Sequence, residues 1–414
     1  MKRDLHLSRI EPSVLGRLFL LGDRRESPYC FTLMIVLDAP LDRARLDRAW
    51  AETVAEFPAL GWRFQGGAWR PGEAVAVRSE LSALGTRIDP RRSPPVRIYG
   101  LSRAILWEVH HGLCDGVAFG RVCLRVLARL FGLPLEPWTP DLSDPFAPLA
   151  AARGLPKVGL GRTIPYPFRG WTRAPRWSWT WELDAPPLRE LAARWSSSIP
   201  DLTTALFAKA SSAWVGAPTP LNLSLPVNLR TLCGLRSDGN ACGMVELELD
   251  VAPDSDLEAV CRAIGAQRAH EYQAERQLGR IAGAARAFAN PVLRALPWVA
   301  QQALAEAVSR GVSDRKRTAM ISWFGSDWIR GALREHVRLV VGYPMVKDYR
   351  MCSLGCGETG DRLAVTFHLR AKEPRIVECF RAELERAAPG AVRGAWSLSR
   401  AGLRWAGPQA RVAP

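Results

Sequence analysis

The sequence lacks the features that mark exported and membrane-spanning proteins. Residues 1–6 start basic, but no continuous apolar segment and no small-residue cleavage site follow them, so we expect no signal peptide. No run approaches the roughly 18 consecutive apolar residues that a transmembrane helix needs. These absences predict a cytoplasmic protein.

The cysteines show no pairing pattern. Nine are scattered over 414 residues, and Cys352 and Cys356 come nearest to the close spacing of metal ligands. No further cluster of His or Cys completes such a site, so we expect no bound metal. Reduced thiols fit this distribution better than a disulfide framework does.

Acidic residues are scarce relative to basic ones. Asp and Glu number 41 against 56 Lys and Arg, a net charge of +15. Excess positive charge suits partners that carry phosphate or other negative charge: nucleic acid, an anionic membrane, coenzyme A or an acidic carrier protein. No zinc finger, recognition helix or dense basic tract is present, so we do not expect nucleic-acid binding. The arginine content is equally compatible with genome base composition alone.

Histidine is also rare, and two of the six stand side by side as His110 and His111. They belong to the string Trp-Glu-Val-His-His-Gly-Leu-Cys-Asp-Gly at residues 107–116. Residues 104–107 predict a buried strand, and the apolar spacing of residues 117–131 predicts a helix. The histidines therefore lie in a loop between two rigid elements, where reactive side chains are commonly presented.

The residue types in this loop suit proton transfer. A partly desolvated imidazole can take a proton from a hydroxyl or amine. Asp115 follows His111 by four residues and either orients the ring or anchors the loop. Cys114 is either a thiol nucleophile or a small residue in a crowded turn, and Gly112 and Gly116 let the chain turn sharply. The alternative without catalysis is a pair of loop histidines bonded to backbone carbonyls.

The string His-His-x-x-x-Asp-Gly resembles the signature of the acyltransferase superfamily with the chloramphenicol acetyltransferase fold. That group includes peptide-synthetase condensation domains, polyketide-associated and alcohol acyltransferases, and wax ester or diacylglycerol synthases. The resemblance implies that His111 is the general base and that His110, Asp115 and Gly116 are mainly architectural. It further implies an arginine partner for the motif aspartate, at the end of a Pro-Val-x-x-Arg-like string that ends here at Arg230.

A second segment resembles the family's crossing strand. Residues 319–325 lie where relatives carry a Ser-Asn-Leu-Gly-like string, and Trp323 and Phe324 replace Asn-Leu here. The chain therefore has no residue in this string that could take over a role of that asparagine. The resemblance makes Ser322, Trp323 and Gly325, together with Gly112, candidates to line a substrate tunnel.

The predicted elements divide the chain into two lobes. We expect an N-terminal lobe at 1–150 that carries the histidine loop, a Pro- and Gly-rich linker at 151–178, and a C-terminal lobe at 179–414. Alternation over residues 177–181 predicts a strand with three indoles on one face, either buried under the neighbouring lobe or forming an interfacial belt. Other expected elements include strands at 29–37, 96–99, 221–230, 244–251, 337–343, 348–353 and 363–369, and a hairpin at 60–70. We also expect helices at 41–57, 188–195, 201–215 and, as the closing element, 376–388, and a largely helical segment at 257–308 that is interrupted at Pro291 and Pro297.

The resemblance implies an α+β fold of two-layer sandwich lobes, arranged as a pseudo-dimer with a central tunnel. The implied activity is a condensation-like acyl transfer from coenzyme A, or from a phosphopantetheinyl carrier in trans, to a hydroxyl or amine of a small molecule or lipid. We expect no bound cofactor, a monomer, and a role in secondary metabolism. The alternatives are a non-catalytic relative that binds a carrier or an enzyme, and a lipid O-acyltransferase at a membrane surface that uses residues 171–181 and 286–317.

Overall fold

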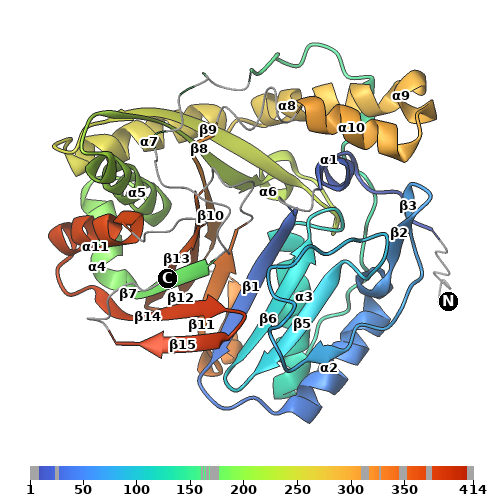
Figure 1. The fold of residues 1–414 in the computed structure, drawn as a ribbon, viewed down its shortest axis with the longest axis horizontal. Coiled ribbons are helices and arrows are strands. Elements are labelled where there is room, and N and C mark those ends of the chain that lie inside the picture. The colour runs from blue at the N-terminus through green and yellow to red at the C-terminus, as the bar shows by residue number, and fades with distance from the viewer. Residues whose placement is uncertain are drawn as a thin grey trace.

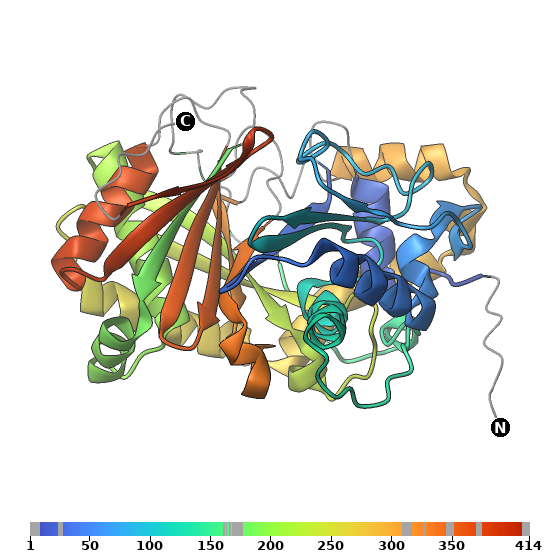
Figure 2. The same cartoon turned by 90° about the horizontal axis from the view of Figure 1, so that it is seen from below.

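The computed structural model describes residues 9–23, 28–159, 162, 164, 167, 177–308, 317–325, 328–344, 352–369 and 375–407. Two lobes lie side by side, and each consists of a sheet with helices packed on it (Figure 2). The larger sheets are open and of different sizes, and neither closes into a barrel. The predicted α+β, two-lobe architecture is confirmed.

The N-terminal lobe is built on a five-stranded sheet of order β11-β1-β6-β5-β4. Strand β1, which lies between β11 and β6, is a run of β-branched and other apolar residues that is buried over most of its length, as expected of an interior strand. Helices α2 and α3 pack together in the apolar core of this lobe. The elements are α1 (Val14–Gly22), β1 (Cys30–Leu37), α2 (Arg43–Glu56), η1 (Pro58–Gly61), the hairpin of β2 (Arg63–Gln65) and β3 (Ala68–Arg70), β4 (Val77–Arg78), β5 (Val96–Leu101), β6 (Ala104–His110), α3 (Gly116–Phe131) and η2 (Ala147–Ala150).

The C-terminal lobe carries an eight-stranded sheet of order β15-β14-β7-β13-β12-β10-β8-β9. Helices α5 and α11 pack against each other, and α4 and α7 contact α5. The elements are β7 (Trp177–Asp184), α4 (Ala185–Arg194), α5 (Ile199–Val215), β8 (Thr219–Asn228), α6 (Leu229–Cys233), β9 (Cys242–Val251), α7 (Leu257–Glu271), β10 (Ala319–Phe324), η5 (Gly331–Glu335), β11 (Val337–Tyr343), β12 (Cys352–Thr359), β13 (Arg362–Leu369), α11 (Arg375–Ala387), β14 (Val392–Ser399) and β15 (Gly402–Ala406).

Strand β11 joins the two lobes. It comes from the C-terminal half of the sequence, yet it pairs with β1 at the edge of the N-terminal sheet. It also packs against β12 and β13. Glycines allow this close approach, because a Cβ at Gly355 would lie 2.0 Å from the carbonyl oxygen of Gly342, and one at Gly357 would lie 2.2 Å from that of Val340.

A helical segment covers one end of the molecule (Figure 1). It consists of α8 (Ala274–Ala289), α9 (Pro291–Ala295) and α10 (Trp298–Val308), and Pro291 marks the break that the sequence predicts. Both α8 and α10 contact α1, the first helix of the chain. None of the described helices is long and apolar enough to cross a membrane.

Three sequence predictions need correction. The helix at 376–388 is not the closing element, because β14 and β15 follow it. The strand predicted at 348–353 begins at Cys352, and residues 348–351 lie outside the described part of the chain. Trp179 and Trp181 are buried in the core of their own lobe, so they are neither covered by the other lobe nor part of an interfacial belt. The Trp177 side chain and Trp171 lie outside the described residues.

Candidate active site

The histidine loop connects a buried strand to a buried helix. Strand β6 ends at His110, which is paired with Cys30 of β1. Helix α3 begins at Gly116, and the Asp115 carboxylate caps it by accepting a hydrogen bond from the backbone N–H of Ala118 at 2.9 Å. The loop between these elements is therefore held at both ends.

His110 is fully buried and holds the loop from inside. Its Nδ1 accepts a hydrogen bond from the backbone N–H of Gly112 at 2.9 Å, and its Nε2 lies 3.5 Å from Asp23 Oδ1. A Cβ at Gly112 would lie 2.6 Å from the Leu20 side chain and 2.9 Å from His110 Nδ1. Only glycine therefore fits at position 112, which lies in the loop as a turn residue.

His111 lies between two phenylalanines. The Phe19 ring, from α1, stacks on the imidazole with a centroid distance of 4.7 Å and an interplanar angle of 18°. The Phe31 ring, from β1, lies 4.6 Å away at 52°. Desolvation lowers the pKa of His111 to about 4, a change that the nearby Asp115 charge opposes and His110 reinforces. The imidazole is consequently neutral at pH 7, the form that a general base requires.

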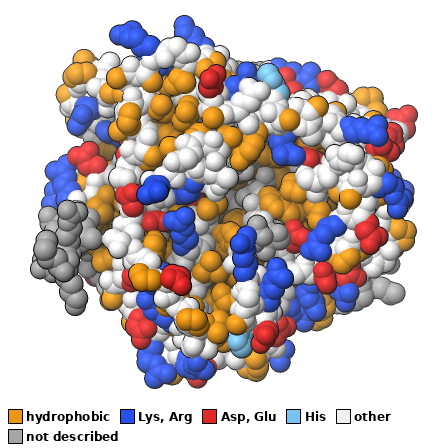
Figure 3. Space-filling model, turned by 180° about the vertical axis from the view of Figure 1, so that it is seen from behind, with side chains coloured by type: hydrophobic (Ala, Val, Ile, Leu, Met, Phe, Trp, Pro, Cys, Tyr) orange, Lys and Arg blue, Asp and Glu red, His pale blue; other side chains and the backbone are white. Residues whose placement is uncertain are grey.

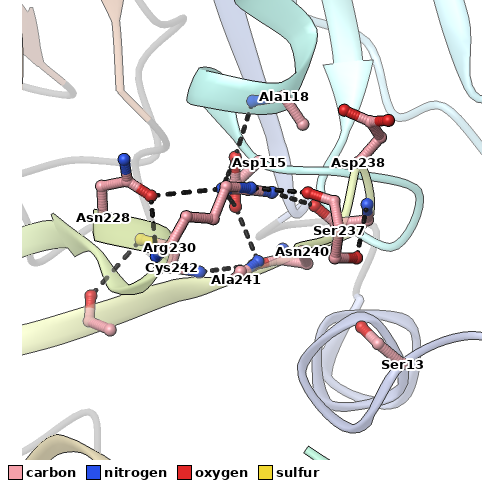
Figure 4. Close-up of polar contacts among 12 residues, drawn as sticks. Ser13, Asp115, Ala118, Asn228, Arg230, Ser237, Asp238, Asn240, Ala241 and Cys242 are labelled. Atoms are coloured by element: carbon pink, nitrogen blue, oxygen red, sulfur yellow. Dashed lines mark hydrogen bonds and ion pairs between the residues drawn. The ribbon is translucent and has the colours of Figure 1, made fainter. Parts of the chain in front are cut away.

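The Asp115 carboxylate binds groups of the C-terminal lobe. Its carboxylate oxygens lie 3.1 and 2.9 Å from Nη1 of Arg230, in α6. Its Oδ2 also accepts a hydrogen bond from the backbone N–H of Ala241 at 2.7 Å. Both side chains are buried, so this carboxylate is fully engaged in fastening the loop to the other lobe (Figure 4).

Residues 237–241, just before β9, dock on the N-terminal lobe. Ser237 Oγ donates to the carbonyl of Ser143 at 3.0 Å. Asp238 accepts hydrogen bonds from Arg121 at 2.7 Å and Trp138 at 3.2 Å. Asn240, which is fully buried, donates from Nδ2 to the carbonyl oxygen of His111 at 2.9 Å. The two lobes therefore both contribute to the surroundings of His111.

The crossing strand β10 places an aromatic ring beside the histidine loop. Phe324 contacts Gly116, where a Cβ would lie 3.1 Å from the ring, and covers Gly342 of β11, where a Cβ would lie 1.9 Å from it. Ser322, Trp323 and Gly325 are each partly exposed. Ser322 pairs with Gly355 of β12. Their predicted place along a substrate tunnel remains a prediction.

The other candidate groups in the loop are already occupied or inert. The N–H of Gly112 bonds to His110 Nδ1 and that of Leu113 to the His110 carbonyl, so neither is free to bind an oxyanion. Burial raises the pKa of the Cys114 thiol well above its usual range, which argues against a thiolate nucleophile. Among the described residues, no group of three or more His, Cys, Asp or Glu is placed to hold a metal ion.

Sequence reasoning did not identify three residues that contact His111. Phe19 and Phe31 belong to a helix and a strand whose apolar residues all look alike as core residues. In sequence, Asn240 indicates only a turn, since an Asn after a Gly is a common turn signal. Nothing in the sequence reports that this turn reaches the other lobe.

No protein-family model matches the sequence, and no curated protein matches it significantly. Solved structures do match. The first condensation domain of the CDA synthetase aligns with a TM-score of 0.64 and 16% identity, over 93% of this chain and 97% of that domain. Polyketide synthase associated protein 5 from Mycobacterium tuberculosis aligns at 0.62 and 14%, over 92% and 98% of the respective chains. F. graminearum TRI101, solved with ethyl coenzyme A, aligns at 0.62 and 12%, over 90% and 97%.

These identities are low, but the alignments span both lobes and nearly the whole of each compared chain. The fold implied by the His-His-x-x-x-Asp-Gly string is therefore confirmed independently of that string. The chain therefore has the fold of these three solved structures.

Proposed function

We propose that this protein is an acyltransferase that moves an acyl group from a thioester to a hydroxyl or amine, with His111 as general base. The observation that carries the proposal is the His111 ring itself. It is neutral, enclosed by Phe19 and Phe31, and located where the two lobes meet. The face in Figure 3 is hollowed near its centre, with hydrophobic side chains on part of its border and Lys and Arg side chains close by, a combination that suits an apolar acyl group on a phosphate-bearing donor.

In the proposed reaction the His111 imidazole takes the proton of the acceptor hydroxyl or amine as its oxygen or nitrogen attacks the thioester carbonyl carbon. The resulting tetrahedral intermediate collapses, the carbon–sulfur bond breaks, and the thiolate leaves. The imidazolium returns the proton to the thiolate, so the acyl group has changed partner and the histidine is restored. The packed phenylalanines would exclude water, which otherwise competes for the acyl group.

The proposed donor is acyl-coenzyme A or an acyl group on a phosphopantetheinyl carrier. The matching F. graminearum TRI101 structure holds ethyl coenzyme A and that of F. sporotrichioides holds coenzyme A and T-2, while condensation domains match this chain with TM-scores of 0.64 and 0.62. Both donors carry phosphate, in keeping with the net charge of +15. The donor acts as a co-substrate, and the acceptor is a small molecule or a lipid.

The decisive experiment measures thiol release. Purified protein is incubated with a panel of acyl thioesters and candidate acceptors, and mass spectrometry identifies the acylated products. We expect thiol release that depends on the acceptor and is lost in His111→Ala. If the unaltered protein released thiol no faster than His111→Ala with every thioester of the panel, the result would favour the non-catalytic alternative, in which the protein binds a carrier or an enzyme.

One observation favours the second candidate, a lipid acyltransferase at a membrane surface. Large hydrophobic side chains that are exposed among the described residues are concentrated on α1, α9 and α10 rather than spread over the molecule. These residues are Leu18, Val292, Val299, Leu304 and Val308. Arg286 and Arg294 are exposed in the same helical region, a combination that suits an anionic lipid interface.

Vesicle flotation separates this candidate from a purely soluble reaction. The double variant Val292→Ser/Val299→Ser removes two side chains that are each 71% exposed. Val215→Ser, on α5, is the matched control, since Val215 is also exposed, at 39%. Membrane contact would be supported if the unaltered protein and the control float with anionic vesicles while the double variant floats less. It would be excluded if the unaltered protein does not float.

A further inference from the structure

Asn240 is the side chain from the C-terminal lobe that meets the imidazole of His111. Its Nδ2 donates to the His111 carbonyl oxygen at 2.9 Å and lies 3.5 Å from His111 Nδ1. The residue is fully buried, although it belongs to a loop rather than to a strand. A buried amide at this place has to satisfy its hydrogen bonds within the protein.

The orientation of the Asn240 amide is determined by its two neighbours. The oxygen accepts from the backbone N–H of Cys242 at 3.3 Å, while the nitrogen faces the carbonyl of His111. Turning the amide over would place oxygen against oxygen and N–H against N–H. The group beside His111 Nδ1 is therefore an N–H donor.

Among the described residues, no carboxylate is hydrogen-bonded to His111 Nδ1, and the nearest one that affects its pKa, Asp115, is engaged elsewhere. The carboxylate of Asp115 is occupied by Arg230 and by the N–H groups of Ala118 and Ala241. From β6 the titratable neighbour is His110, whose charge would oppose protonation of the ring. Tyr29, which begins the segment leading into β1, packs edge-on against the Phe19 ring of α1.

The remaining sides of the ring are apolar. Phe19 and Phe31 cover it from α1 and β1, and neither residue titrates. Desolvation raises the pKa of the Cys242 thiol, on β9, to about 12, so it carries no charge at neutral pH. Asn240 thus holds the place that a carboxylate holds in a His–Asp pair.

We propose that Asn240 is the positioning residue of His111: it anchors the carbonyl of the histidine from the opposite lobe and places an uncharged amide, rather than a carboxylate, 3.5 Å from Nδ1. The catalytic meaning of this assignment rests on the proposed function. The effect of Asn240 on the pKa of His111 is independent of that function, because a neutral N–H donor beside the ring disfavours the imidazolium whatever reaction the protein catalyses. At 3.5 Å the contact to Nδ1 is long, so the tautomer with hydrogen on Nδ1, which Nε2 needs in order to accept a proton, stays accessible.

The test introduces a carboxylate of the same shape. Asn240→Asp should raise the pKa of His111 above that of the unaltered protein, because a carboxylate beside Nδ1 stabilises the imidazolium. The pKa is measured by NMR titration of protein with isotope-labelled histidines, and the His111 signal is assigned as the one missing in His111→Gln. Ser237→Ala is the control. Ser237 docks the same loop but bonds Ser143 and Gly239 instead of His111, so it should leave the pKa unchanged.

Asn240→Ala tests positioning separately and replaces the first variant if Asn240→Asp does not fold. Loss of the anchor should lower kcat by up to about 10²-fold, with little change in KM, whereas Ser237→Ala should retain kcat. An unchanged His111 titration in Asn240→Asp, or an unchanged kcat in Asn240→Ala, would overturn the assignment. If His111→Ala itself stayed active, the proposed function would fail, while the NMR titration would still decide on Asn240.

Discussion

Nη1 of Arg230 lies 2.9 and 3.1 Å from the two carboxylate oxygens of Asp115, across the boundary between the lobes. The predicted contact is present, and a single guanidinium nitrogen faces both oxygens, so the two parallel hydrogen bonds common in arginine–carboxylate pairs do not form. The other guanidinium nitrogens are used elsewhere, with Nε donating to the carbonyl of Ser237 and Nη2 to that of Gly239, each at 2.6 Å. Arg230 therefore binds the histidine loop and the loop of Asn240 at once.

The first prediction concerns the stability of this pair. Removing one partner leaves a buried charge without compensation, so Asp115→Ala and Arg230→Ala should each lower the free energy of unfolding by about 3–5 kcal/mol. The double variant should cost less than the sum of the two. Urea unfolding of the unaltered protein, the two single variants and the double variant measures these free energies. Additive losses would exclude a direct coupling. An Asp115→Asn variant with lost turnover and normal stability would point instead to an aspartate that orients the imidazole.

The second prediction separates the two adjacent histidines. His111→Ala should lower turnover by about 10²–10⁴-fold, the usual contribution of a general base, and leave the fold intact. His110→Ala should act through stability, because His110 is buried and bonds Gly112 within the loop. Thermal unfolding and thiol release are measured on both variants. A His110→Ala protein with a normal melting temperature and no activity would contradict this division of roles.

The strand and helix on either side of the histidine loop could be predicted because each is a local pattern. Residues 104–109 are continuously apolar apart from Glu108, and residues 117–131 have apolar residues at helical spacing. The contact of Asp115 with Arg230 was found through a resemblance between two short strings that are 115 positions apart in the sequence.

The neighbours of His111 could not be predicted in this way. Phe19 and Phe31 are indistinguishable in sequence from other core aromatics, and their stacking on the imidazole depends on how α1 packs over β1. The pairing of β11 with β1 was missed for the same reason, since register between distant strands depends on tertiary packing and not on local pattern.

The third prediction is a pH dependence. The pKa of His111 is about 4 in the folded protein and about 6.5 in an unfolded chain, so the unfolded state binds the extra proton between these values. The free energy of unfolding should therefore rise with pH from about 4 to about 6.5 and level off above. Urea unfolding across this range measures the slope, and His111→Gln should reduce it. The acid limb of kcat/KM should likewise lie near pH 4, and a limb near 6.5 would contradict the lowered pKa.

The fourth prediction concerns packing beneath the histidine loop. A Cβ at Gly120, in α3, would lie 2.4 Å from the Trp328 ring, so Gly120→Ala should destabilise the protein by about 1–3 kcal/mol through overpacking. Gly283, in α8, is the matched control, because a Cβ there meets no atom within 4 Å. Gly283→Ala should stabilise by roughly 0.5–1 kcal/mol, the ordinary helix preference for Ala. Equal melting temperatures for the two variants would show that Trp328 does not pack on α3.

The fifth prediction concerns capture of the donor. If the net charge of +15 guides a phosphate-bearing thioester to the site, kcat/KM for an acyl-coenzyme A should fall as ionic strength rises, because salt screens interactions beyond about 10 Å at 0.1 M. The matched donor is the same acyl group on N-acetylcysteamine, which has the reacting thioester and no phosphate. Its kcat/KM should be independent of salt. Steady-state rates at low and moderate salt give both values. Equal salt dependence for the two donors would assign the effect to the acceptor or to the protein itself, whereas a difference confined to the coenzyme A donor would locate it in phosphate recognition.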